Sequence, residues 1–424
     1  MLDLKFIRNH PEVVKAGAEK KRIPCDVDRI LELDVEVRRL KHEAETKKAE
    51  QNAKTKEIPQ LQGDEKQAAI AAMRALGEEQ KALDGEAKEL ERQLRELMLR
   101  VPNPPAPEVP EGVDDTENVE TRREGEVPKF DFSPRSHLEL GEMHDLFEFE
   151  RASRIAGSRT YFLKNMGALL ELSVLRLALD HMVAKGYTPM LVPNLVRYEA
   201  MEGTAYFPGG EEQAYACTRE DGFLIGTAEV PLTSFHMGEI LAEEDLPIRL
   251  VGWSNCYRRE AGAAGRDTKG LYRIHQFQKI EQVVIGPNDE EASRRFHREI
   301  LTNSEEVLRM LELPYRVVDV CGGDLGQGQI QKYDIETWMP SREAFSETHS
   351  ASRFHEFQAR RLELRYRDGE KKVRYCHTLN NTVIASPRVL IPLLECHQQK
   401  DGSIRIPAAL RPYLGGREVL EPTR

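Results

Sequence analysis

Two neighbouring segments of this 424-residue chain limit the folds it can adopt, because their apolar residues recur every three or four positions. The first segment spans 27–58 and the second 64–99, and both are rich in Ala, Glu, Lys, Leu and Arg. This period places the apolar residues along one side of a helix, as coiled-coil helices require. The predicted seam consists of Ile30, Leu33, Val37, Leu40 and Ala44 in the first segment, and of Met73, Leu76, Leu83, Ala87, Leu90, Leu94 and Leu97 in the second.

Only a short break separates the two segments. Within it, Pro59 stops a helix and Asp64 is expected to cap the next one. A connection of this length makes the two helices antiparallel neighbours, so that each covers the seam of the other. At 1.5 Å per residue, the hairpin would extend for about 50 Å.

A proline-rich tract follows the hairpin. The ten residues from Val101 to Pro110 include five prolines, which cannot continue a helix and favour a stiff, extended connection. We therefore expect a helical hairpin domain over 1–100, a linker over 101–115 and a second domain over 116–424.

Beyond the linker, helical segments alternate with runs of β-branched and aromatic residues that glycines interrupt. Helices are predicted at 166–185 and 289–311, and strands at 186–197, 222–227, 248–258, 271–286, 314–320, 330–338 and 372–380. Several neighbouring runs are joined by short turns, which favours an antiparallel sheet with helices packed on it. The predicted fold class is therefore α+β.

Charge and cysteine content narrow the function classes. A net charge of −11 argues against nucleic-acid binding over the whole surface. A local basic strip is nevertheless present in the first helical segment: Arg38, Arg39, Lys41, Lys47, Lys48, Lys54 and Lys56. Charge alone leaves two interpretations of this strip, a solvated helix face or a phosphate-binding surface.

The sequence also predicts where the protein resides. It has no apolar run of 18 residues, so we expect no membrane helix. The N-terminal segment MLDLKFIRNHPEVVKAG lacks the apolar core of a secretory signal, which predicts a cytoplasmic location. The six cysteines are scattered without a C-x-x-C pair, so we expect free thiols and no zinc site.

The stretch from Cys256 to Gln282 gathers residues suited to a nucleotide. If 271–284 form a strand, alternation places Arg273, His275, Phe277, Lys279 and Glu281 on one face. Arg258 and Glu260 share a face of the preceding run, and the loop 261–270 would let the two strands pair as a hairpin. Arginines match phosphate oxygens and an aromatic ring stacks on a purine. The alternative is an exposed strand whose charges pair with one another.

Specific motifs favour the nucleotide. Tyr257-Arg258-Arg259-Glu260 resembles motif 2 of the class II aminoacyl-tRNA synthetases. Within that class the chain resembles the seryl-tRNA synthetase family of the bacterial and eukaryotic type, nearly from end to end. The resemblance includes Ile7-Arg8-Asn9-His10-Pro11-Glu12, the helical hairpin, Gly226-Thr227-Ala228-Glu229, Gln276-Phe277-Gln278-Lys279-Ile280-Glu281, Phe357-Gln358-Ala359-Arg360-Arg361 and His377-Thr378-Leu379-Asn380.

For ATP, the resemblance implies a binding set drawn from three motifs. The implied residues are Arg258, Arg259, Glu260, Arg273, Phe277, Glu347, Thr348, His349, Ser350 and Arg388. Arg258 would meet the α-phosphate, Phe277 would stack on adenine and Arg388 would meet the γ-phosphate. Glu347 and Ser350 would hold Mg²⁺, and Arg258, Glu260, Glu347 and Arg388 are the implied catalytic residues.

For the other substrates, the resemblance implies L-serine and serine tRNA, and leaves open whether selenocysteine tRNA is charged as well. The implied serine-binding residues are Thr227, Ala228, Glu229, Arg258, Glu281 and Thr382. The hairpin would bind the tRNA through the basic strip. Leu169–Lys185 followed by 186–193 resembles motif 1, which implies a homodimer.

The chain departs from the family pattern in two places. Motif 3 lacks its usual glycines and has Asn380-Asn381-Thr382-Val383-Ile384-Ala385-Ser386-Pro387-Arg388. His349 stands where the family usually has serine, and we expect it to act in packing or near the ribose rather than in catalysis. Two alternatives remain: an enzyme that activates an amino acid for a carrier protein, and a coiled-coil RNA-binding protein with an inactive catalytic domain.

Overall fold

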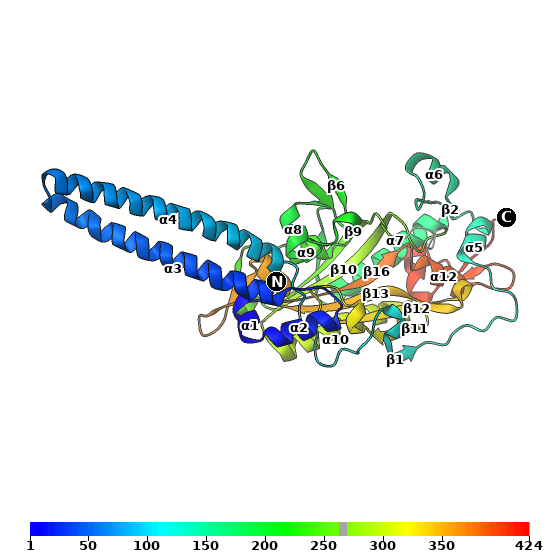
Figure 1. Cartoon of the computed structure of the whole chain (residues 1–424). Coiled ribbons are helices and arrows are strands. Elements are labelled where there is room, and N and C mark those ends of the chain that lie inside the picture. Colours follow the sequence, from blue (N-terminus) through cyan, green and yellow to red (C-terminus); the bar gives the residue numbers. More distant parts are fainter. Residues whose placement is uncertain (263–268, 424) are drawn as a thin grey trace. The chain divides into compact units, whose positions relative to one another are not determined.

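The computed structural model describes residues 1–262 and 269–423 (Figure 1). The chain forms two compact units. The hairpin unit comprises Met1–Glu19 and Ile23–Pro104, and the sheet unit comprises Lys20–Arg22 and Pro105–Arg424. The proline-rich tract is therefore divided between the units, and its later part packs in the sheet unit, where Ala106 and Val109 contact Val320 and Leu325.

The hairpin unit is built on two long antiparallel helices, as its heptads predict (Figure 1). Its elements are α1 (Leu4–Asn9), α2 (Pro11–Lys20), α3 (Val27–Glu57), the 3₁₀ turn η1 (Ile58–Gln60) and α4 (Gly63–Met98). Every predicted seam residue is buried or half-buried. Near the tip the seam ends, because Ala44 is the last buried residue of α3 and Leu76 the first of α4.

The predicted cap of α4 is wrong by two positions. The helix begins at Gly63, so Asp64 lies inside its first turn, and Gln62 occupies the cap position without a capping hydrogen bond from its side chain. Gly63 has a φ of +55°, which glycine adopts without strain and which allows the helix to start before the aspartate. Asp64 still stabilises the start of the helix, because its negative charge interacts favourably with the positive end of the helix dipole.

The sheet unit contains an eight-stranded sheet with the order β1-β11-β12-β13-β16-β10-β9-β4. In that order the strands are Val119–Glu124, Tyr315–Asp319, Gln331–Met339, Ala344–His355, His377–Ser386, Gln276–Gly286, Ile248–Tyr257 and Thr188–Leu191. All neighbours are antiparallel except β4 and β9, which are parallel. The predicted α+β fold, a helical hairpin and an antiparallel sheet flanked by helices, is confirmed.

Shorter elements complete the sheet unit. The helices are α5 (His137–Met143), α6 (Glu150–Ala156), α7 (Met166–Ala184), α8 (Tyr198–Gly203), α9 (Glu229–Thr233), α10 (Glu290–Met310), α11 (Phe357–Leu362) and α12 (Leu390–His397). Two small sheets have two strands each: β2 (Phe147–Glu148) pairs with β3 (Phe162–Leu163), and β17 (Ile404–Arg405) pairs with β18 (Val419–Leu420). In a third sheet, β7 (Gly222–Leu224) lies between β5 (Leu195–Val196) and β6 (Tyr215–Cys217). In a fourth, β14 (Arg365–Arg367) lies between β8 (Ile240–Ala242) and β15 (Val373–Tyr375). Within the described ranges, none of the helices has the length and apolar character needed to span a membrane.

The two faces of β10 show how the sheet is covered. Ile280 and Val284 belong to the main core, which also holds buried residues of α7, α10 and α12. Val283 and Ile285 point to the other face and pack with α9 and α11. Because strand residues alternate, Glu281 lies on this second face, away from α7 and α10.

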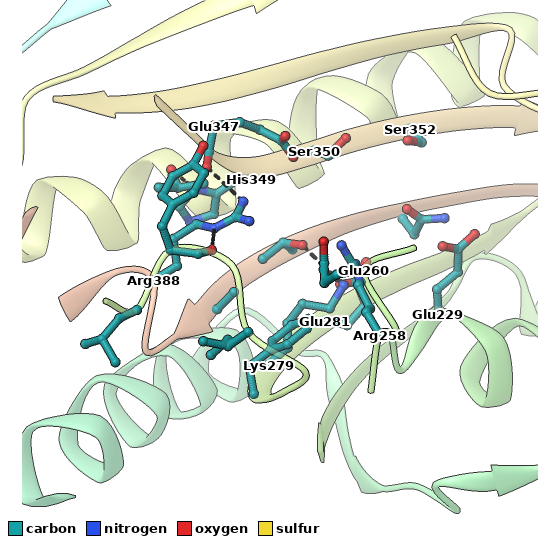
Figure 2. A pocket seen from close by; sticks show the side chains of 18 of the residues that line it. Glu229, Arg258, Glu260, Lys279, Glu281, Glu347, His349, Ser350, Ser352 and Arg388 are labelled. Carbon is teal, nitrogen blue, oxygen red and sulfur yellow. Dashed lines mark hydrogen bonds and ion pairs between the residues drawn. The ribbon is translucent and has the colours of Figure 1, made fainter. Parts of the chain in front are cut away.

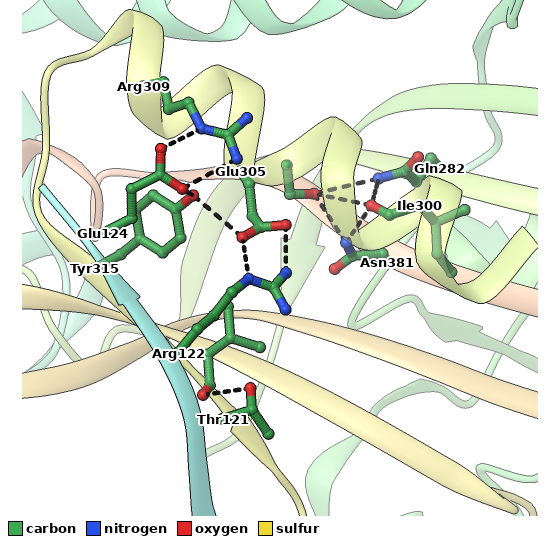
Figure 3. Close-up of polar contacts among 11 residues, drawn as sticks. Thr121, Arg122, Glu124, Gln282, Ile300, Glu305, Arg309, Tyr315 and Asn381 are labelled. Carbon is green, nitrogen blue, oxygen red and sulfur yellow. Dashed lines mark hydrogen bonds and ion pairs between the residues drawn. The ribbon is translucent and has the colours of Figure 1, made fainter. Parts of the chain in front are cut away.

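Polar contacts fasten α10 to the sheet at two places (Figure 3). Arg122 of β1 donates two hydrogen bonds to the buried Glu305, at 3.0 and 2.6 Å. Gln282 of β10 and Asn381 of β16 both donate to the Ile300 carbonyl, at 2.8 and 2.7 Å. These contacts hold β10 and β16 in register from the face that the helices cover.

The strands differ from the prediction in three respects. β10 begins at Gln276 rather than near Leu271, β13 was not predicted, and β16 continues to Ser386. The residues of the predicted loop 261–270 that lie between 262 and 269 fall outside the described part of the chain, but β9 and β10 pair as an antiparallel hairpin. The sequence of β13 is rich in hydroxyl and charged residues, so its strand character comes from pairing with β12 and β16 rather than from local propensity.

Candidate active site

A cavity of about 240 Å³ lies on the face of β10 opposite α7 and α10. Its lining comes from β10, β13, β16 and the start of α9, from the segments that flank β9 and β10, and from the segments that hold Tyr206 and Gln329. Of the residues predicted for the site, it is lined by Glu229, Arg258, Glu260, Phe277, Glu281, Glu347, Thr348, His349, Ser350, Thr382 and Arg388. A second cavity of about 480 Å³ adjoins it, because Arg258, Glu260 and Arg388 line both.

The cavity has two chemically different ends (Figure 2). Arg388 and Glu347 lie together at one end, and Glu229 lies at the other. Glu281 and Arg258 lie between them. One end therefore offers a cationic group beside a carboxylate, and the other offers the buried carboxylate of Glu229, with the buried Glu281 between the two ends.

Glu229 is a buried carboxylate with two hydrogen-bond donors. Gln358 Nε2 lies 2.8 Å from one oxygen and Tyr206 Oη lies 2.9 Å from the other. Burial, followed by the charge of Glu281, raises the pKa of Glu229 to about 7. A cationic ligand at this point would favour the ionised form of Glu229 and would offset part of the cost of its burial.

Glu281 is buried beside a lysine and a threonine. Lys279 Nζ lies 2.5 Å from Glu281 Oε2, and the Thr382 hydroxyl donates to the same oxygen at 3.3 Å. Lys279 Nζ also lies 3.4 Å from Thr382 Oγ1. Phe277, Lys279 and Glu281 project from β10 into the cavity, as the predicted alternation requires.

Arg258 follows the last residue of β9 and borders both cavities. Its guanidinium carbon lies 5.2 Å from the ring centroid of Phe277. Its backbone N–H donates to the His275 carbonyl at 3.0 Å, which fixes the segment leaving the strand. The cation and the aromatic ring predicted to act together are thus adjacent.

Glu260 and Arg273 form an ion pair, with 2.7 Å between Glu260 Oε2 and Arg273 Nη1. Arg273 borders the second cavity, together with Glu260. It precedes β10 and so does not share that strand's face with Phe277, contrary to the prediction. The ion pair instead brings it to the cavity edge.

Glu347 and Ser350 place a carboxylate and a hydroxyl on the cavity wall from the same strand, β13. Among the described residues, the Glu347 carboxylate forms no ion pair. Mg²⁺ prefers oxygen ligands and commonly takes one or two from the protein and the rest from phosphates and water. The donor set of Glu347 and Ser350 fits that requirement.

His349 is buried and hydrogen-bonded on both ring nitrogens. Nδ1 lies 2.8 Å from Thr348 Oγ1, and Nε2 lies 3.1 Å from the Val383 carbonyl. Burial lowers the pKa of His349 to about 4, so the imidazole is neutral at physiological pH. These contacts link β13 to β16, so His349 acts as a packing residue in the cavity wall.

Three predicted residues do not line either cavity. Arg259 is exposed and is not among the residues that line the two cavities. Ala228 is fully buried in the core between α9 and the sheet. Thr227 is buried, and its hydroxyl accepts a hydrogen bond from the backbone N–H of Glu229 at 3.2 Å, so it supports that carboxylate from behind.

Further residues at the site had no predicted role, among them Lys279, Gln358, Tyr206 and Tyr272. Lys279 was placed on the correct face by strand alternation, and Gln358 lies within a motif that carried the resemblance. Tyr206 lies outside regular elements, where no periodicity marks it. Tyr272 falls within the predicted strand 271–286, but β10 begins only at Gln276, so strand alternation does not apply to it. Only the structure brings these two tyrosines to the cavity.

Comparison with known proteins gives a consistent result over the full chain. Residues 1–105 match the family described as the seryl-tRNA synthetase N-terminal domain, and residues 215–397 match the tRNA synthetase class II core domain (G, H, P, S and T). The chain is 48% identical to the serine–tRNA ligase of Deinococcus radiodurans, with both chains covered completely. It is 43% identical to that of Rubrobacter xylanophilus, again over the whole of both chains.

Solved structures agree. The chain matches a crystal structure of seryl-tRNA synthetase from Pyrococcus horikoshii complexed with ATP, with a TM-score of 0.94, 39% identity and complete coverage of both chains. It also matches the cytoplasmic serine–tRNA ligase of Naegleria fowleri in complex with AMP, with a TM-score of 0.89 and 30% identity over 100% of this chain and 99% of the other.

Proposed function

The chain belongs to the seryl-tRNA synthetases, and from that premise we propose how its residues divide the work of activating L-serine with ATP and charging serine tRNA. The enzyme is a class II aminoacyl-tRNA synthetase. The observation that carries the proposal is a single cavity with an arginine and oxygen donors at one end and buried carboxylates at the other. Measuring serine transfer to selenocysteine tRNA tests whether that tRNA is charged as well.

ATP occupies the part of the cavity that Arg258, Phe277 and Arg388 line. Adenine stacks against the Phe277 ring, and Arg258 binds the α-phosphate. Arg388 binds the γ-phosphate, while the Glu260–Arg273 ion pair lies at the edge shared with the second cavity. Arg259 takes no part, since it lines neither cavity.

Glu347 and Ser350 hold Mg²⁺ together with phosphate oxygens. When bound, the cation offsets the negative charge of the triphosphate. Thr348 and His349 keep this part of β13 in place through their mutual hydrogen bond and the contact of His349 with the Val383 carbonyl. Thr348 and His349 therefore support the cavity wall and do not transfer protons.

L-Serine binds at the carboxylate end. The ammonium group lies between Glu229 and Glu281, whose charges it balances. The serine hydroxyl is recognised by the Glu281 and Thr382 pair, and Lys279 fixes that pair through contacts of 2.5 and 3.4 Å. An amino acid without the hydroxyl cannot form the hydrogen bonds that serine adds to these buried polar groups, which disfavours its binding relative to serine.

The first step needs no enzyme nucleophile. The serine carboxylate attacks the α-phosphorus of ATP, and Arg258 stabilises the charge that develops there. Arg388 binds the leaving pyrophosphate. In the second step the terminal ribose hydroxyl of tRNA attacks the seryl carbonyl and releases AMP. Catalysis consists mainly of holding the reacting groups in line.

The hairpin unit binds tRNA through its basic strip. Four of the seven strip residues are ion-paired within the unit: Arg38 with Asp34, Arg39 with Glu36 and Glu43, Lys41 with Glu91, and Lys47 with Glu79. Lys48, Lys54 and Lys56 are exposed, and among the described residues they form no ion pair. We therefore assign the main phosphate contacts to these three lysines.

The enzyme acts as a homodimer through the motif 1 segment. Support comes from apolar side chains of α7 and β4 that are exposed in the single chain: Leu169 and Leu172 at about 50% and Leu191 at 85%. A sedimentation mass of twice the chain mass would support the dimer, and a monomer at micromolar concentration would contradict it.

The remaining assignments follow from this function. We place the enzyme in the cytoplasm, without zinc, and we divide it into a tRNA-binding domain over 1–100, a linker over 101–115 and a catalytic domain over 116–424. Fractionation of cells with an antibody to the chain tests the location. Metal analysis of the purified protein tests the absence of zinc.

Two assays test the proposal as a whole. The first measures exchange of labelled pyrophosphate into ATP, which requires reversible formation of seryl-adenylate and should depend on serine and Mg²⁺. The second measures transfer of serine to serine tRNA. Exchange without transfer would favour activation for a carrier protein, and absence of both would contradict the proposed function.

A further inference from the structure

Arg388 contacts Tyr272 through both the backbone carbonyl and the ring of the tyrosine. Arg388 Nε donates to the Tyr272 carbonyl at 3.2 Å, and its guanidinium carbon lies 4.4 Å from the centroid of the Tyr272 ring. Nη1 donates to the Glu347 carbonyl at 3.1 Å. Within the described residues Nη2 has no protein acceptor, which leaves this nitrogen to meet a phosphate oxygen.

The Tyr272 ring also holds a second guanidinium. Arg342, the last residue of the 3₁₀ turn η6 (Pro340–Arg342), has its guanidinium carbon 4.3 Å from the same ring centroid. Each cation is attracted to the ring by the quadrupole of the aromatic face. The two cations repel each other, so a polyanion bound nearby would relieve part of that repulsion.

We propose that Tyr272 is a positioning residue for pyrophosphate, which holds Arg388 toward the cavity while Arg342, on the same ring, adds a second positive charge at this end. This inference rests on the proposed function, because it requires a triphosphate substrate. As serine attacks, a bond forms between a carboxylate oxygen and the α-phosphorus. The bond from that phosphorus to the bridging oxygen breaks, and its electron pair leaves with pyrophosphate. The negative charge therefore grows on the group that Arg388 binds.

A packing role alone is the competing explanation. Tyr272 packs at the edge of a small apolar cluster with Leu271, Met339 and Ile391. Loss of packing would raise the KM values for ATP, pyrophosphate and serine alike. Loss of a phosphate-positioning ring would affect only the two phosphate-bearing substrates, so separate KM values distinguish the two roles.

The chain provides a matched control. Phe345 on β13 also holds two arginines, with the guanidinium carbons of Arg123 and Arg316 at 4.7 and 5.5 Å from its ring centroid. Phe345 does not line the described cavities. Phe345→Leu therefore removes an equivalent aromatic ring and its cation contacts at a place where no phosphate is expected.

The experiment compares KM values for ATP, pyrophosphate and serine in the exchange assay. We expect Tyr272→Leu to raise the KM for ATP and pyrophosphate by about tenfold and to change the KM for serine by less than about twofold. Tyr272→Phe keeps the ring and should stay within about twofold of the wild type, because the Tyr272 hydroxyl makes no hydrogen bond to the described residues. Arg342→Gln should raise the two KM values by about threefold, and Phe345→Leu should leave them unchanged.

A double variant identifies the route of the effect. If Tyr272 acts through Arg388, Tyr272→Leu combined with Arg388→Ala should be no worse than Arg388→Ala alone. If the two substitutions raise the KM values additively in the double variant, the proposal is overturned. Equal KM values for Tyr272→Leu and Tyr272→Phe would also overturn it. So would a rise in the KM for serine in Tyr272→Leu as large as the rise for ATP. Tyr272→Met, which fills the same space without a ring, replaces Tyr272→Leu if that variant does not fold. A wild-type enzyme without serine-dependent exchange would instead contradict the proposed function.

Discussion

The hairpin unit and the cavity of the sheet unit use charge in opposite ways. On the hairpin, Arg39 is exposed between Glu36 and Glu43, so water and neighbouring charges already screen it. In the cavity, Glu229 and Glu281 are buried within reach of each other's charge. We therefore expect single substitutions on the hairpin to change activity only slightly, whereas single substitutions in the cavity should have large effects on particular substrates.

The largest effect is expected for Arg258→Ala. This residue borders both cavities beside Phe277. In the proposed mechanism, its charge stabilises the α-phosphate during attack. We expect kcat/KM for exchange to fall about 1,000-fold without loss of the folded state. The adjacent Arg259→Ala is the matched control, because Arg259 is equally exposed but lines neither cavity. Exchange rates near wild type for Arg258→Ala, or an equal loss for Arg259→Ala, would contradict the assignment.

Removal of the hairpin separates the two units by function. A deletion of residues 36–90 keeps the buried base formed by Ile30, Leu33, Leu94 and Met98. We expect exchange to stay within about threefold of the wild type and tRNA charging to fall by about 100-fold or more, because the phosphate contacts are lost. Undiminished charging by the shortened enzyme would exclude the hairpin as the tRNA-binding element.

Serine binding should weaken as the pH falls through the raised pKa of Glu229, which lies at about 7. Below that pKa the free enzyme carries a neutral Glu229, and the proposed ammonium site loses one of its two carboxylate charges. We expect the KM for serine to rise about tenfold from pH 8 to pH 6, with a much smaller change for ATP. Glu229→Gln should raise the KM at pH 8 and remove its pH dependence in this window. A wild-type KM that is constant from pH 8 to pH 6 would argue against an ionised Glu229 as ammonium partner.

The smallest effects are expected for single lysines of the hairpin. Lys48→Ala, Lys54→Ala or Lys56→Ala should each lower kcat/KM for charging by about twofold to threefold, and the triple variant should also reduce its salt dependence. Arg39→Ala should change charging less, since Glu36 and Glu43 already neutralise that arginine. A larger loss for Arg39→Ala than for the triple variant would reverse the assignment of phosphate contacts.

The same contrast explains how far sequence alone predicts the molecule. The hairpin depends on a local heptad pattern, so its seam from Ile30 to Leu97 could be predicted residue by residue. The face of β10 that carries Phe277, Lys279 and Glu281 follows in the same way from strand alternation. Both results need only the period of one element.

The parts that could not be predicted depend on contacts between distant segments. β13 is central to the sheet but has no apolar alternation of its own, and it is defined by its neighbours β12 and β16. Tyr206 and Gln358 reach Glu229 from segments far apart in the chain. The wrong placement of Arg273 on β10 has the same origin, because the start of that strand is set by pairing with Tyr257.

Buried polar groups around Glu281 and Thr382 are proposed to recognise the hydroxyl of a small amino acid beside ATP. The most direct test is pyrophosphate exchange by the full chain with serine, alanine and threonine in turn. We expect kcat/KM for serine to exceed that for alanine by about 10,000-fold, because alanine cannot form the hydrogen bonds that the serine hydroxyl makes with those buried groups. Comparable exchange with alanine, or none with serine, would contradict this account of the site.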